Sequence, residues 1–500
     1  MTTAIPTSVP ESLQPFLAKP KHLLINGKWG EANSGETFEV FNPASGEVVA
    51  HCAAGDKNDV DQAVKAARAA FEDGPWSKMS ASERSRIIWR IGELIEANSE
   101  ELARLETLDN GKPYGVALVA DVALAADMFR YMAGWVTKIS GDTFPISVPY
   151  APGSQFHAYT AKEPIGVVGQ IIPWNFPLLM AAWKLGPALA AGCAVVLKPA
   201  EQTPLSAIRL GELMQQAGLP DGVVNIITGF GETAGAAIAA HDGIDKVAFT
   251  GSTEVGKIIL KAAAGNLKKV TLELGGKSPN VVYKDADMDT AIAGAASAVF
   301  FNQGQVCCAG SRLFIEQDVF DDVVSGVSEI AGKMKVGSGF DEGTEMGPLV
   351  SKAQHDRVKG YLADGLSAGA QAVAGGSAID RPGYFVQPTV LSHVTDDMKV
   401  VKEEIFGPVI AALPFKDDHE VTQRSNDTDY GLAAGVWTKD ISKAHRLAKS
   451  IRAGTVWVNC FNIFDAALPF GGYKQSGWGR EMGYDAVENY LETKSVCVGL

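Results

Sequence analysis

Apolar side chains recur at helical spacing through much of the first 140 residues. A first helix is predicted within residues 58–75, and further helices are predicted over residues 81–133, where a second amphipathic period follows. The apolar side of the first helix is formed by Val60, Ala63, Val64, Ala67 and Phe71. Neither stretch contains residues that suggest a chemical role.

From Ile165 onward, short apolar runs alternate with helical stretches. Five runs are predicted to be strands: residues 165–173, 194–199, 223–229, 246–251 and 269–276. The helices between them are predicted at residues 178–191, 204–218, 232–241 and 252–265. Near-continuous apolar strands with short connections to helices are typical of a parallel sheet that is covered on both faces. This part of the chain is therefore predicted to be a doubly wound α/β domain.

A second α/β series follows and predicts a second domain with its own sheet. Its apolar runs lie in "PNVVYKDAD", "RLFIEQ", "GPVIAALPF", "GLAAGVWTK" and "TVWVNC", and a helix is predicted after Phe320. Residues 142–164 and the C-terminal "YLETKSVCVGL" read as strands that belong to neither domain. These two strands could pair with each other or with another subunit.

Composition agrees with an ordinary enzyme of several domains. The chain has 500 residues, of which 46% are hydrophobic, and this is enough for two or three domains with large cores. The formal net charge of −14 argues against a nucleic-acid binder, which needs a basic face. The six cysteines are scattered, which favours a reducing compartment over a disulfide scaffold.

No secretory or membrane segment is expected. The N-terminal "MTTAIPTSVPESLQPF" lacks a basic region followed by an apolar core. The most apolar window, residues 180–197, is interrupted by Lys184, Pro187 and two glycines, which divide it into a buried helix and a buried strand. The expectation is a cytoplasmic protein without a membrane partner.

Three stretches after predicted strands have the composition of a nucleotide site. "GFGETAG", at residues 229–235, is one residue off the usual dinucleotide fingerprint and reads better as a tight turn. In "FTGSTEVG", Gly251 ends a strand and Ser252 can cap the next helix, whose N-terminus then offers a seat for a pyrophosphate. In "LKPAEQTP", Lys198 and Glu201 could hold the hydroxyls of a ribose; a surface ion pair is the other interpretation.

Two adjacent cysteines, Cys307 and Cys308, lie in "FFNQGQVCCAG". Taken alone, the pair is compatible with packing, a disulfide, a metal corner or a nucleophile. Glu273 ends one predicted strand, however, and Asn175 follows another. A thiolate can attack a carbonyl carbon, a carboxamide can stabilise the oxyanion, and a carboxylate can activate water. The three residue types together point to acyl chemistry.

Seven stretches, in this order, make the chain resemble the aldehyde dehydrogenase superfamily over essentially its whole length. They are "PWNFP", "LKPAEQTP", "FTGSTEVG", "LELGGKSP", "NQGQVCCAGSR", "EEIFGPV" and "PFGGYKQSG". The resemblance implies an α/β aldehyde dehydrogenase fold with two parallel-sheet, Rossmann-like domains and a small β oligomerisation domain. The implied boundaries are 13–141 with 165–275 for NAD binding, 276–475 for catalysis, and 142–164 with 476–500 for oligomerisation. A homotetramer or homodimer is the implied assembly.

The resemblance also implies a role for each motif residue. Cys307 matches the nucleophile, Asn175 and the N–H of Cys307 match the oxyanion site, and Glu273 matches the general base. The residues that match the cofactor site are Trp174, Lys198, Glu201, Gly251, Ser252, Gln354, Glu404 and Phe406. Cys308 is then expected to pack beside the nucleophile. No metal site is expected, because no histidine lies in a ligand-like motif with the pair.

The implied reaction oxidises an aldehyde to a carboxylic acid through a cysteine thiohemiacetal and a thioester. NAD is favoured over NADP, because Glu201 would repel a 2′-phosphate. A glutamate at the position of Glu273 favours hydrolysis of the thioester over transfer to CoA. The presence of both Cys307 and Glu273 argues against a member of the family that has kept the fold as a structural or binding protein.

The positions that match the family's substrate tunnel are mostly aromatic. They are Phe176, Met180, Trp183, Phe301, Val306, Phe464 and Phe470. Without an arginine or histidine among them, we expect an uncharged apolar or aromatic aldehyde. "NCFNIFDAALPFGGYKQSGWGRE" is also similar to bacterial phenylacetaldehyde dehydrogenases. Two other interpretations remain: the aromatic residues are common to many relatives, or Asp465 selects an amino-aldehyde.

Overall fold

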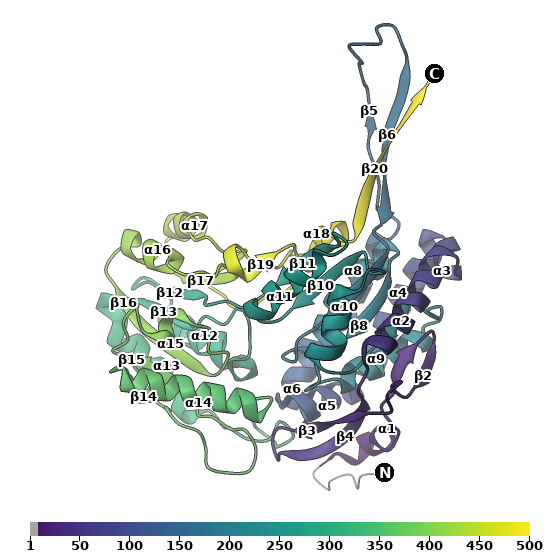
Figure 1. Ribbon diagram of the computed structural model, residues 1–500. Helices are drawn as coiled ribbons and strands as arrows, with labels where there is room; N and C mark the ends of the chain where they lie inside the picture. Colours follow the sequence, from purple (N-terminus) through teal and green to yellow (C-terminus); the bar gives the residue numbers. More distant parts are fainter. Residues whose placement is uncertain (1–8) are drawn as a thin grey trace.

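A computed structural model describes residues 9–500 of the chain (Figure 1). Two large sheets covered by helices lie side by side, and a narrow three-stranded sheet projects from the body of the molecule. This arrangement confirms the α/β fold with two parallel-sheet domains and a small β unit. Residues 1–8 lie outside the described residues. They form half of the N-terminal stretch in which no secretory segment was expected.

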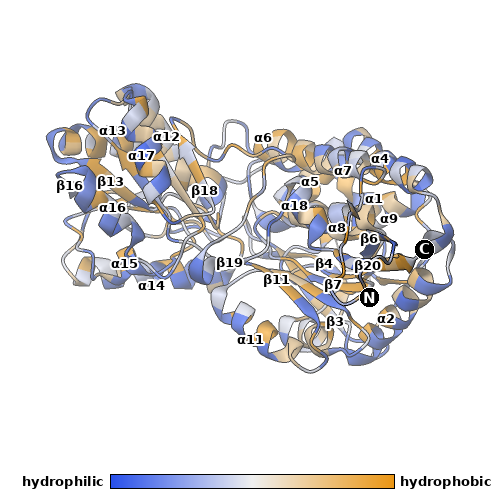
Figure 2. Ribbon diagram, turned by 90° about the horizontal axis from the view of Figure 1, so that it is seen from above, coloured by the Kyte–Doolittle hydropathy of each residue, from blue (hydrophilic) through white to orange (hydrophobic). Residues whose placement is uncertain are grey.

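The first sheet has the five predicted strands at its centre. These strands run parallel in the order β11-β10-β7-β8-β9. They are β7 (Val167–Ile171), β8 (Ala194–Lys198), β9 (Val224–Ile226), β10 (Lys246–Thr250) and β11 (Lys269–Glu273). Figure 2 shows orange, hydrophobic residues in the strands of this sheet and many blue, hydrophilic residues in the helices around it. The burial of β7, β8 and β10 along their whole length explains their continuous apolar sequences.

Short strands that the sequence analysis missed extend this sheet at both edges. They are β1 (Leu23–Ile25), β2 (Lys28–Gly30) and β19 (Gly477–Trp478). A separate two-stranded ladder, β3 (Thr37–Asn42) and β4 (Glu47–Ala53), was also missed. Strands of two or three residues are too short to show a period, which is the physical reason that β1, β2 and β19 escaped prediction.

The helices of the first domain match the predicted periods and have identifiable ends. α2 (Lys57–Glu72) starts with a reciprocal capping box between Asp56 and Asp59. α8 (Pro177–Ala191) starts with proline and ends at Gly192, whose φ of +99° favours glycine. α8 and β8 divide the apolar window as predicted. The other helices that connect the strands are α9 (Leu205–Gln216), α10 (Ala236–Ala240) after a π-helical turn η3 (Gly231–Gly235), and α11 (Thr253–Ala263).

The predicted helical region 81–133 is interrupted several times. α4 (Ala81–Ala97) and α7 (Ala123–Trp135) pack together, and α7 also packs on α8. Between them lie α5 (Ser99–Asn110), α6 (Tyr114–Val116) and a π-helical segment η2 (Ala117–Val122). Short helices α1 (Gln14–Leu17) and α3 (Pro75–Lys78) complete this part. The residue that follows α5 is Gly111, where φ is +93°. At this end of α5, Asn110 Nδ2 donates to the carbonyl oxygen of Asn175, which lies just before α8.

The second sheet has the strand order β14-β15-β16-β13-β12-β17-β18. Five strands were predicted: β12 (Pro279–Val282), β13 (Arg312–Glu316), β16 (Val409–Phe415), β17 (Ala433–Trp437) and β18 (Thr455–Val458). The strands β14 (Gln371–Ala374) and β15 (Thr389–Ser392) were not. The helices of this domain are α12 (Met288–Phe300), α13 (Phe320–Lys333), α14 (Lys352–Ser367), α15 (Lys399–Lys402), α16 (Asp418–Asn426) and α17 (Ile441–Ser450).

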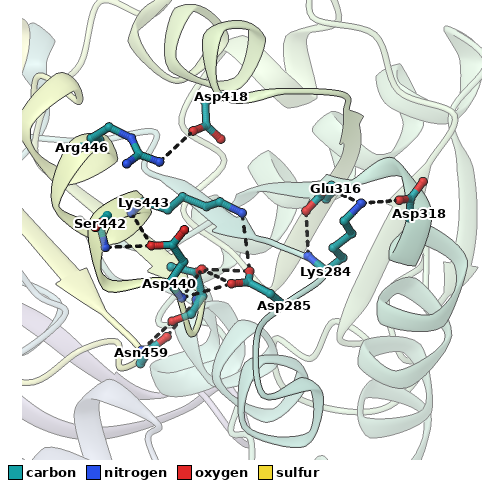
Figure 3. Close-up of polar contacts among 11 residues, drawn as sticks. Lys284, Asp285, Glu316, Asp318, Asp418, Asp440, Ser442, Lys443, Arg446 and Asn459 are labelled. Carbon is teal, nitrogen blue, oxygen red and sulfur yellow. Dashed lines mark hydrogen bonds and ion pairs between the residues drawn. The ribbon is translucent and has the colours of Figure 1, made fainter.

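Polar side chains of the protein itself fill the carboxyl end of this second sheet (Figure 3). After β12, Lys284 pairs with Glu316 at 3.5 Å, and Asp285 accepts hydrogen bonds from Thr438 Oγ1 at 2.8 Å. After β18, Asn459 accepts a hydrogen bond from the amide of Thr438 at 3.0 Å. Ligands of α/β proteins usually bind at carboxyl ends of strands. The carboxyl ends of β7, β10 and β11 in the first sheet, by contrast, line a cavity.

The two strands that belonged to neither domain pair with each other. β20 (Leu491–Gly499) is antiparallel to β6 (Phe156–Pro164) along its whole length, and β5 (Thr143–Phe144) adds a third strand. Together they form the projecting arm in Figure 1. Residues 477–478 instead pair with β11 in the first sheet, and α18 (Gly483–Glu488) packs on α8, so the arm at this end of the chain begins at Leu491.

Within residues 9–500, no helix combines the length and the apolar character that a membrane crossing requires.

Candidate active site

A cavity of about 290 Å³ lies where the two domains meet. The first domain contributes the carboxyl ends of β7, β10 and β11 and one side of α8. The second contributes the turn that leads into β13, the first turns of α14 and the segment around Glu404. Cys307, Asn175 and Glu273 all line this cavity, so the structure brings the three proposed catalytic residues together.

Cys307 lies in a tightly wound turn between α12 and β13. Three consecutive residues before it, Asn302, Gln303 and Gly304, have φ values of +47°, +58° and +70°. Left-handed conformations are costly for residues other than glycine, and side-chain hydrogen bonds must maintain them. Gln303 Oε1 accepts from the amide of Gly347 at 3.2 Å, and Gln305 Oε1 accepts from the amide of Val350 at 3.0 Å. The turn is thus fixed by the glutamines of "NQGQV".

Asn175 follows β7 and lies against this turn. Its Nδ2 atom donates to the carbonyl oxygen of Gln305 at 3.0 Å, and its side chain is buried. A carboxamide nitrogen has two hydrogens, so one N–H is bound to the turn and the second is directed elsewhere. Gln305 lies two residues before Cys307, the proposed nucleophile. A carboxamide held against this turn can therefore donate a hydrogen bond to an oxyanion that forms at Cys307.

Glu273 is the last residue of β11 and is buried at 4% exposure. Burial raises the pKa of its carboxyl group to about 8, a rise that the positive charge of Lys184 opposes. Lys184 itself forms an ion pair with Glu481 at 2.5 Å. Within the described residues, Oε1 of Glu273 has no hydrogen-bond partner. A carboxyl group with such a pKa can accept a proton near neutral pH and release it again.

Contact with Cys308 and burial raise the pKa of the Cys307 thiol well above its usual range, and the charge of Glu273 adds to the rise. The resting nucleophile is therefore a thiol, and its activation requires a proton acceptor. Glu273 lines the same cavity as Cys307, and each of the two groups affects the pKa of the other, so Glu273 is a candidate for this acceptor.

Cys308 is fully buried, and its Sγ atom lies 3.5 Å from Asn462 Oδ1. All six cysteines are free. Among residues 9–500, no group of three or more histidine, cysteine, aspartate or glutamate side chains is arranged to hold a metal ion. Of the roles considered for Cys308, the structure therefore favours packing.

Six of the eight residues predicted for the cofactor site line the cavity, on two sides of it, whereas Lys198 and Glu201 are not among the lining residues. On the first-domain side, Lys198 is buried and pairs with Glu201 at 3.2 Å. Ser252 caps α11 by accepting from the amide of Val255 at 3.2 Å. Thr250 Oγ1, just before Gly251, is buried and lacks a hydrogen-bond partner in the described part of the chain. These groups could receive the hydroxyls and phosphates of a dinucleotide.

On the second-domain side, Glu404 accepts a hydrogen bond from the amide of Gly276 at 2.9 Å, and burial raises the pKa of its carboxyl group to about 7. A Cβ atom at Gly275 would lie 2.2 Å from Glu404 Oε2, so only glycine leaves this carboxylate in place. Phe406, with φ of +59°, stacks edge-on against Trp174 at 5.2 Å, and Gln354 Nε2 donates to its carbonyl oxygen at 2.7 Å.

The residues predicted for the substrate tunnel line the other end of the cavity. All seven are present: Phe176, Met180, Trp183, Phe301, Val306, Phe464 and Phe470. Trp183 lies 6.0 Å from Phe464 and 5.6 Å from Phe470 between ring centroids. Asp465 is exposed, and its Oδ1 atom accepts a hydrogen bond from the amide of Ala467 at 2.8 Å. This carboxylate therefore lies outside the group of aromatic side chains that line the cavity.

Several lining residues were missed by the sequence analysis. Asp121 and Leu124 come from the helical region to which no chemical role had been assigned, and Arg357 comes from α14. Arg357 lies at the cofactor end, where its Nη2 atom donates to the carbonyl oxygen of Glu404 at 2.8 Å. One signal could have revealed Asp121: it is an acidic residue at a position where the helical period expects a buried apolar side chain. A buried carboxylate needs a partner, so such a residue indicates a buried polar contact.

Comparison with known proteins agrees with this geometry. The model of the aldehyde dehydrogenase family matches residues 29–496. Human mitochondrial aldehyde dehydrogenase is 54% identical, with 95% of this chain and 91% of that protein covered. Benzaldehyde dehydrogenase of Antirrhinum majus is 51% identical, with 100% of this chain and 92% of that protein covered. An NAD⁺ complex of Bacillus cereus aldehyde dehydrogenase is similar at a TM-score of 0.96 and 52% identity, with 99% of each chain covered.

Proposed function

Because the chain belongs to the aldehyde dehydrogenase family, and is therefore an oxidoreductase that converts aldehydes to carboxylic acids, we propose that it acts on an apolar aromatic aldehyde such as phenylacetaldehyde, with NAD as the electron acceptor. The observation that carries the substrate proposal is the aromatic wall of the cavity. Rings of Phe176 and Phe301 stack at 6.2 Å on one side, and Trp183 packs with Phe464 and Phe470 on another. The named activity of the benzaldehyde dehydrogenase relative supports the same substrate class.

In the first half of the proposed reaction, the ionised form of Glu273 takes the proton of Cys307 and releases it to solvent, and the Cys307 Sγ atom bonds to the aldehyde carbon. The carbonyl oxygen becomes an oxyanion, and the carboxamide of Asn175 and the amide of Cys307 donate to it. NAD, when bound, would supply a hydride acceptor, and the adduct on Cys307 could then become a thioester. Cys307 and Asn175 hold the reacting carbon beside the cofactor end of the cavity throughout.

In the second half, Glu273 removes a proton from water, and the resulting hydroxide attacks the thioester carbon. The C–S bond then breaks, the acid leaves, and Cys307 is regenerated. A pKa of about 8 allows Glu273 to take the proton and pass it on without becoming trapped in either form. This role for Glu273 predicts that water, and not CoA, accepts the acyl group.

Residues on both sides of the cavity would hold the dinucleotide. Lys198 and Glu201 would bind the adenosine ribose, and Ser252 would face the pyrophosphate at the start of α11. Glu404 would bind the nicotinamide ribose, with Trp174, Gln354 and Phe406 beside it. The carboxylate of Glu201 supports NAD over NADP, because it would repel a phosphate on the ribose.

We further propose that the chain forms a homotetramer, or a homodimer, through the arm, and that it acts in the cytoplasm. The arm exposes apolar side chains such as Phe144, Tyr150 and Val498, which a second subunit would cover. The unpaired state of all six cysteines supports a reducing compartment.

NADH formation with phenylacetaldehyde, hexanal and 4-aminobutanal tests the proposed function. We expect the highest kcat/KM with the aromatic aldehyde, and loss of turnover in Cys307→Ala, because the sulfur forms the bond to the substrate. Cys497→Ala, on the exposed arm, is the matched cysteine control and should keep the parent rate. A preference for 4-aminobutanal would contradict the substrate, and turnover in Cys307→Ala would contradict the nucleophile. Product analysis with and without CoA separates hydrolysis from acyl transfer.

A further inference from the structure

Three side chains donate hydrogen bonds to the main-chain carbonyl oxygen of Asn175. The donors are Lys112 Nζ at 3.0 Å, Asn302 Nδ2 at 3.0 Å and Asn110 Nδ2 at 3.3 Å. Asn302 belongs to the turn that carries Cys307, whereas Asn110 and Lys112 belong to the segment at the end of α5. This one oxygen therefore joins three segments at the residue whose carboxamide lies beside the nucleophile.

Lys112 is the charged donor of the three, and its side chain has no exposed surface. Its ammonium group donates to Asp121 Oδ1 and lies 3.9 Å from Glu106, and both carboxylates are equally buried. A charge in the interior requires such partners, because an unpaired one is very costly. Burial raises the pKa of Glu106 to about 7 and the pKa of Asp121 above its usual value, while the charge of Lys112 opposes both shifts.

The same ammonium group also contacts the substrate end of the cavity. Lys112 Nζ lies 4.3 Å from the ring centroid of Phe176, which is a cation–π distance. Phe176 and Asp121 both line the cavity. Lys112 thus holds the carbonyl group of one residue and the ring of the next, on the two sides of a single peptide bond.

We propose that Lys112 is a positioning residue for the oxyanion site: its ammonium group fixes the peptide that joins Asn175 to Phe176, so that the carboxamide of Asn175 points at the carbonyl oxygen of a substrate on Cys307. This inference rests on the function proposed above. The direction of a short side chain follows the dihedral angles of its own backbone. A fixed carbonyl group therefore fixes the carboxamide, and a misplacement of about 1 Å at a catalytic donor can cost on the order of 10²-fold in rate.

The test follows acylation of Cys307 by p-nitrophenyl acetate, which requires no nicotinamide. Sγ bonds to the acetyl carbon, the bond from that carbon to the aryl oxygen breaks, and p-nitrophenolate leaves, so its burst reports the step that needs the oxyanion site. Asp121→Asn keeps the bond from Lys112 to Asn175. The pair Lys112→Met with Asp121→Asn removes that bond together with the nearer of the two carboxylates, while Glu106 keeps the hydrogen bond that it accepts from the amide of Leu178. We expect the pair to slow the burst roughly 10- to 100-fold relative to Asp121→Asn.

A background with Asn175→Ala separates positioning from a general structural effect. If Lys112 acts through Asn175, its replacement slows the burst in the parent background but not in the Asn175→Ala background, because coupled residues are not additive. Alkylation of Cys307 by iodoacetamide, followed by mass spectrometry of the Cys307 peptide, is the second readout. It forms no oxyanion, so its rate should be the same with and without Lys112.

Equal slowing in both backgrounds would overturn the inference, and so would a burst that Lys112→Met leaves unchanged. Slower alkylation in parallel with slower acylation would show that the whole turn has been disturbed, which also overturns it. A burst that survives Cys307→Ala would overturn the proposed function and this inference together. The failure of one is therefore distinguishable from the failure of both.

Discussion

At the scale of single residues, Glu273, the proposed general base, also makes stability depend on pH. Its carboxyl group ionises at about pH 4.5 when it is free and at about pH 8 in the folded chain, because burial disfavours the charge. Between these values the folded state binds more protons than the unfolded state. The stability that Glu273 contributes is complete below about pH 4.5 and is lost as the pH rises through 8.

Glu273→Gln, which cannot ionise, is therefore expected to become more stable relative to the parent as the pH rises from 5 to 9. We expect the difference in apparent Tm to grow by a few degrees across this range, as measured by thermal unfolding at three pH values. Glu254→Gln, at an exposed position at the start of α11, is the control and should give a constant difference. A difference that does not change with pH for Glu273→Gln would contradict the buried, protonated carboxyl group.

The three proposed catalytic residues could be picked out from the sequence because each stands in a distinctive stretch: Asn175 and Glu273 at the ends of apolar strands, and Cys307 in the turn between α12 and β13. Lys112 and Asp121 could not be predicted in this way. They come from a helical region whose periodicity describes only its apolar side, and the partners of Lys112, Asn175 and Phe176, are more than 60 residues away along the chain. These groups lie close together because of the way α5, η2 and α8 pack. The sequence pattern of a single segment does not report such packing.

At the scale of elements, replacing each of two helical glycines by alanine is expected to change stability in opposite directions. A Cβ atom at Gly294, in α12, would lie 2.1 Å from Cη2 of Trp437. This indole cannot move away easily, because it is buried at 3% exposure and its Nε1 atom donates to Asn280 Oδ1 at 2.8 Å. A Cβ atom at Gly360, in α14, would meet nothing within 4 Å.

We therefore expect Gly294→Ala to destabilise the protein by about 1–3 kcal/mol, since the added methyl group overpacks the contact between α12 and β17. Gly360→Ala should stabilise it by about 0.5–1 kcal/mol, because alanine favours an exposed helix interior. Denaturant unfolding of both variants and the parent measures the two effects, with Gly360→Ala as the matched control. Equal stabilities for the two variants would contradict this packing.

The central strands of both sheets were predictable, whereas most strands at or next to the sheet edges were not. β7, β8 and β10 are buried on both faces, so their sequences are continuously apolar. β14 lies at the edge of the second sheet with mostly exposed residues, and its alternation carries no apolar signal. The sequence pattern reports burial, and an edge strand is stabilised mainly by backbone hydrogen bonds that leave no trace in it.

At the scale of the whole molecule, the arm is the part whose stability the body of the protein does not explain. β20 pairs with β6, an ion pair of 2.6 Å between Lys494 and Glu163 lies along the arm, and one of 2.8 Å joins Glu492 at its base to Lys269 of β11. Such exposed pairs contribute little by themselves. The arm therefore requires its exposed apolar residues to be covered, which is the basis of the proposed assembly.

Removal of residues 492–500 is expected to lower the mass of the assembly, because β6 then loses its partner strand and the surface that a second subunit would contact. Light scattering coupled to size-exclusion chromatography measures this mass. Ser495→Ala changes an exposed side chain of β20 and keeps the ladder, so it should leave the mass unchanged. The same mass for the shortened chain and the parent would show that the arm does not hold the subunits together.

The late position of β20 also has a consequence for how the protein is made. Lys494 is 331 residues away from Glu163, its partner on β6. At synthesis rates of roughly 5–20 residues per second, β6 leaves the ribosome roughly 15–65 seconds before β20 does. β19, which closes the edge of β11, is synthesised at nearly the same late moment. Both open edges are therefore exposed on the nascent chain until translation is almost complete, and during this interval chaperones have the most to protect.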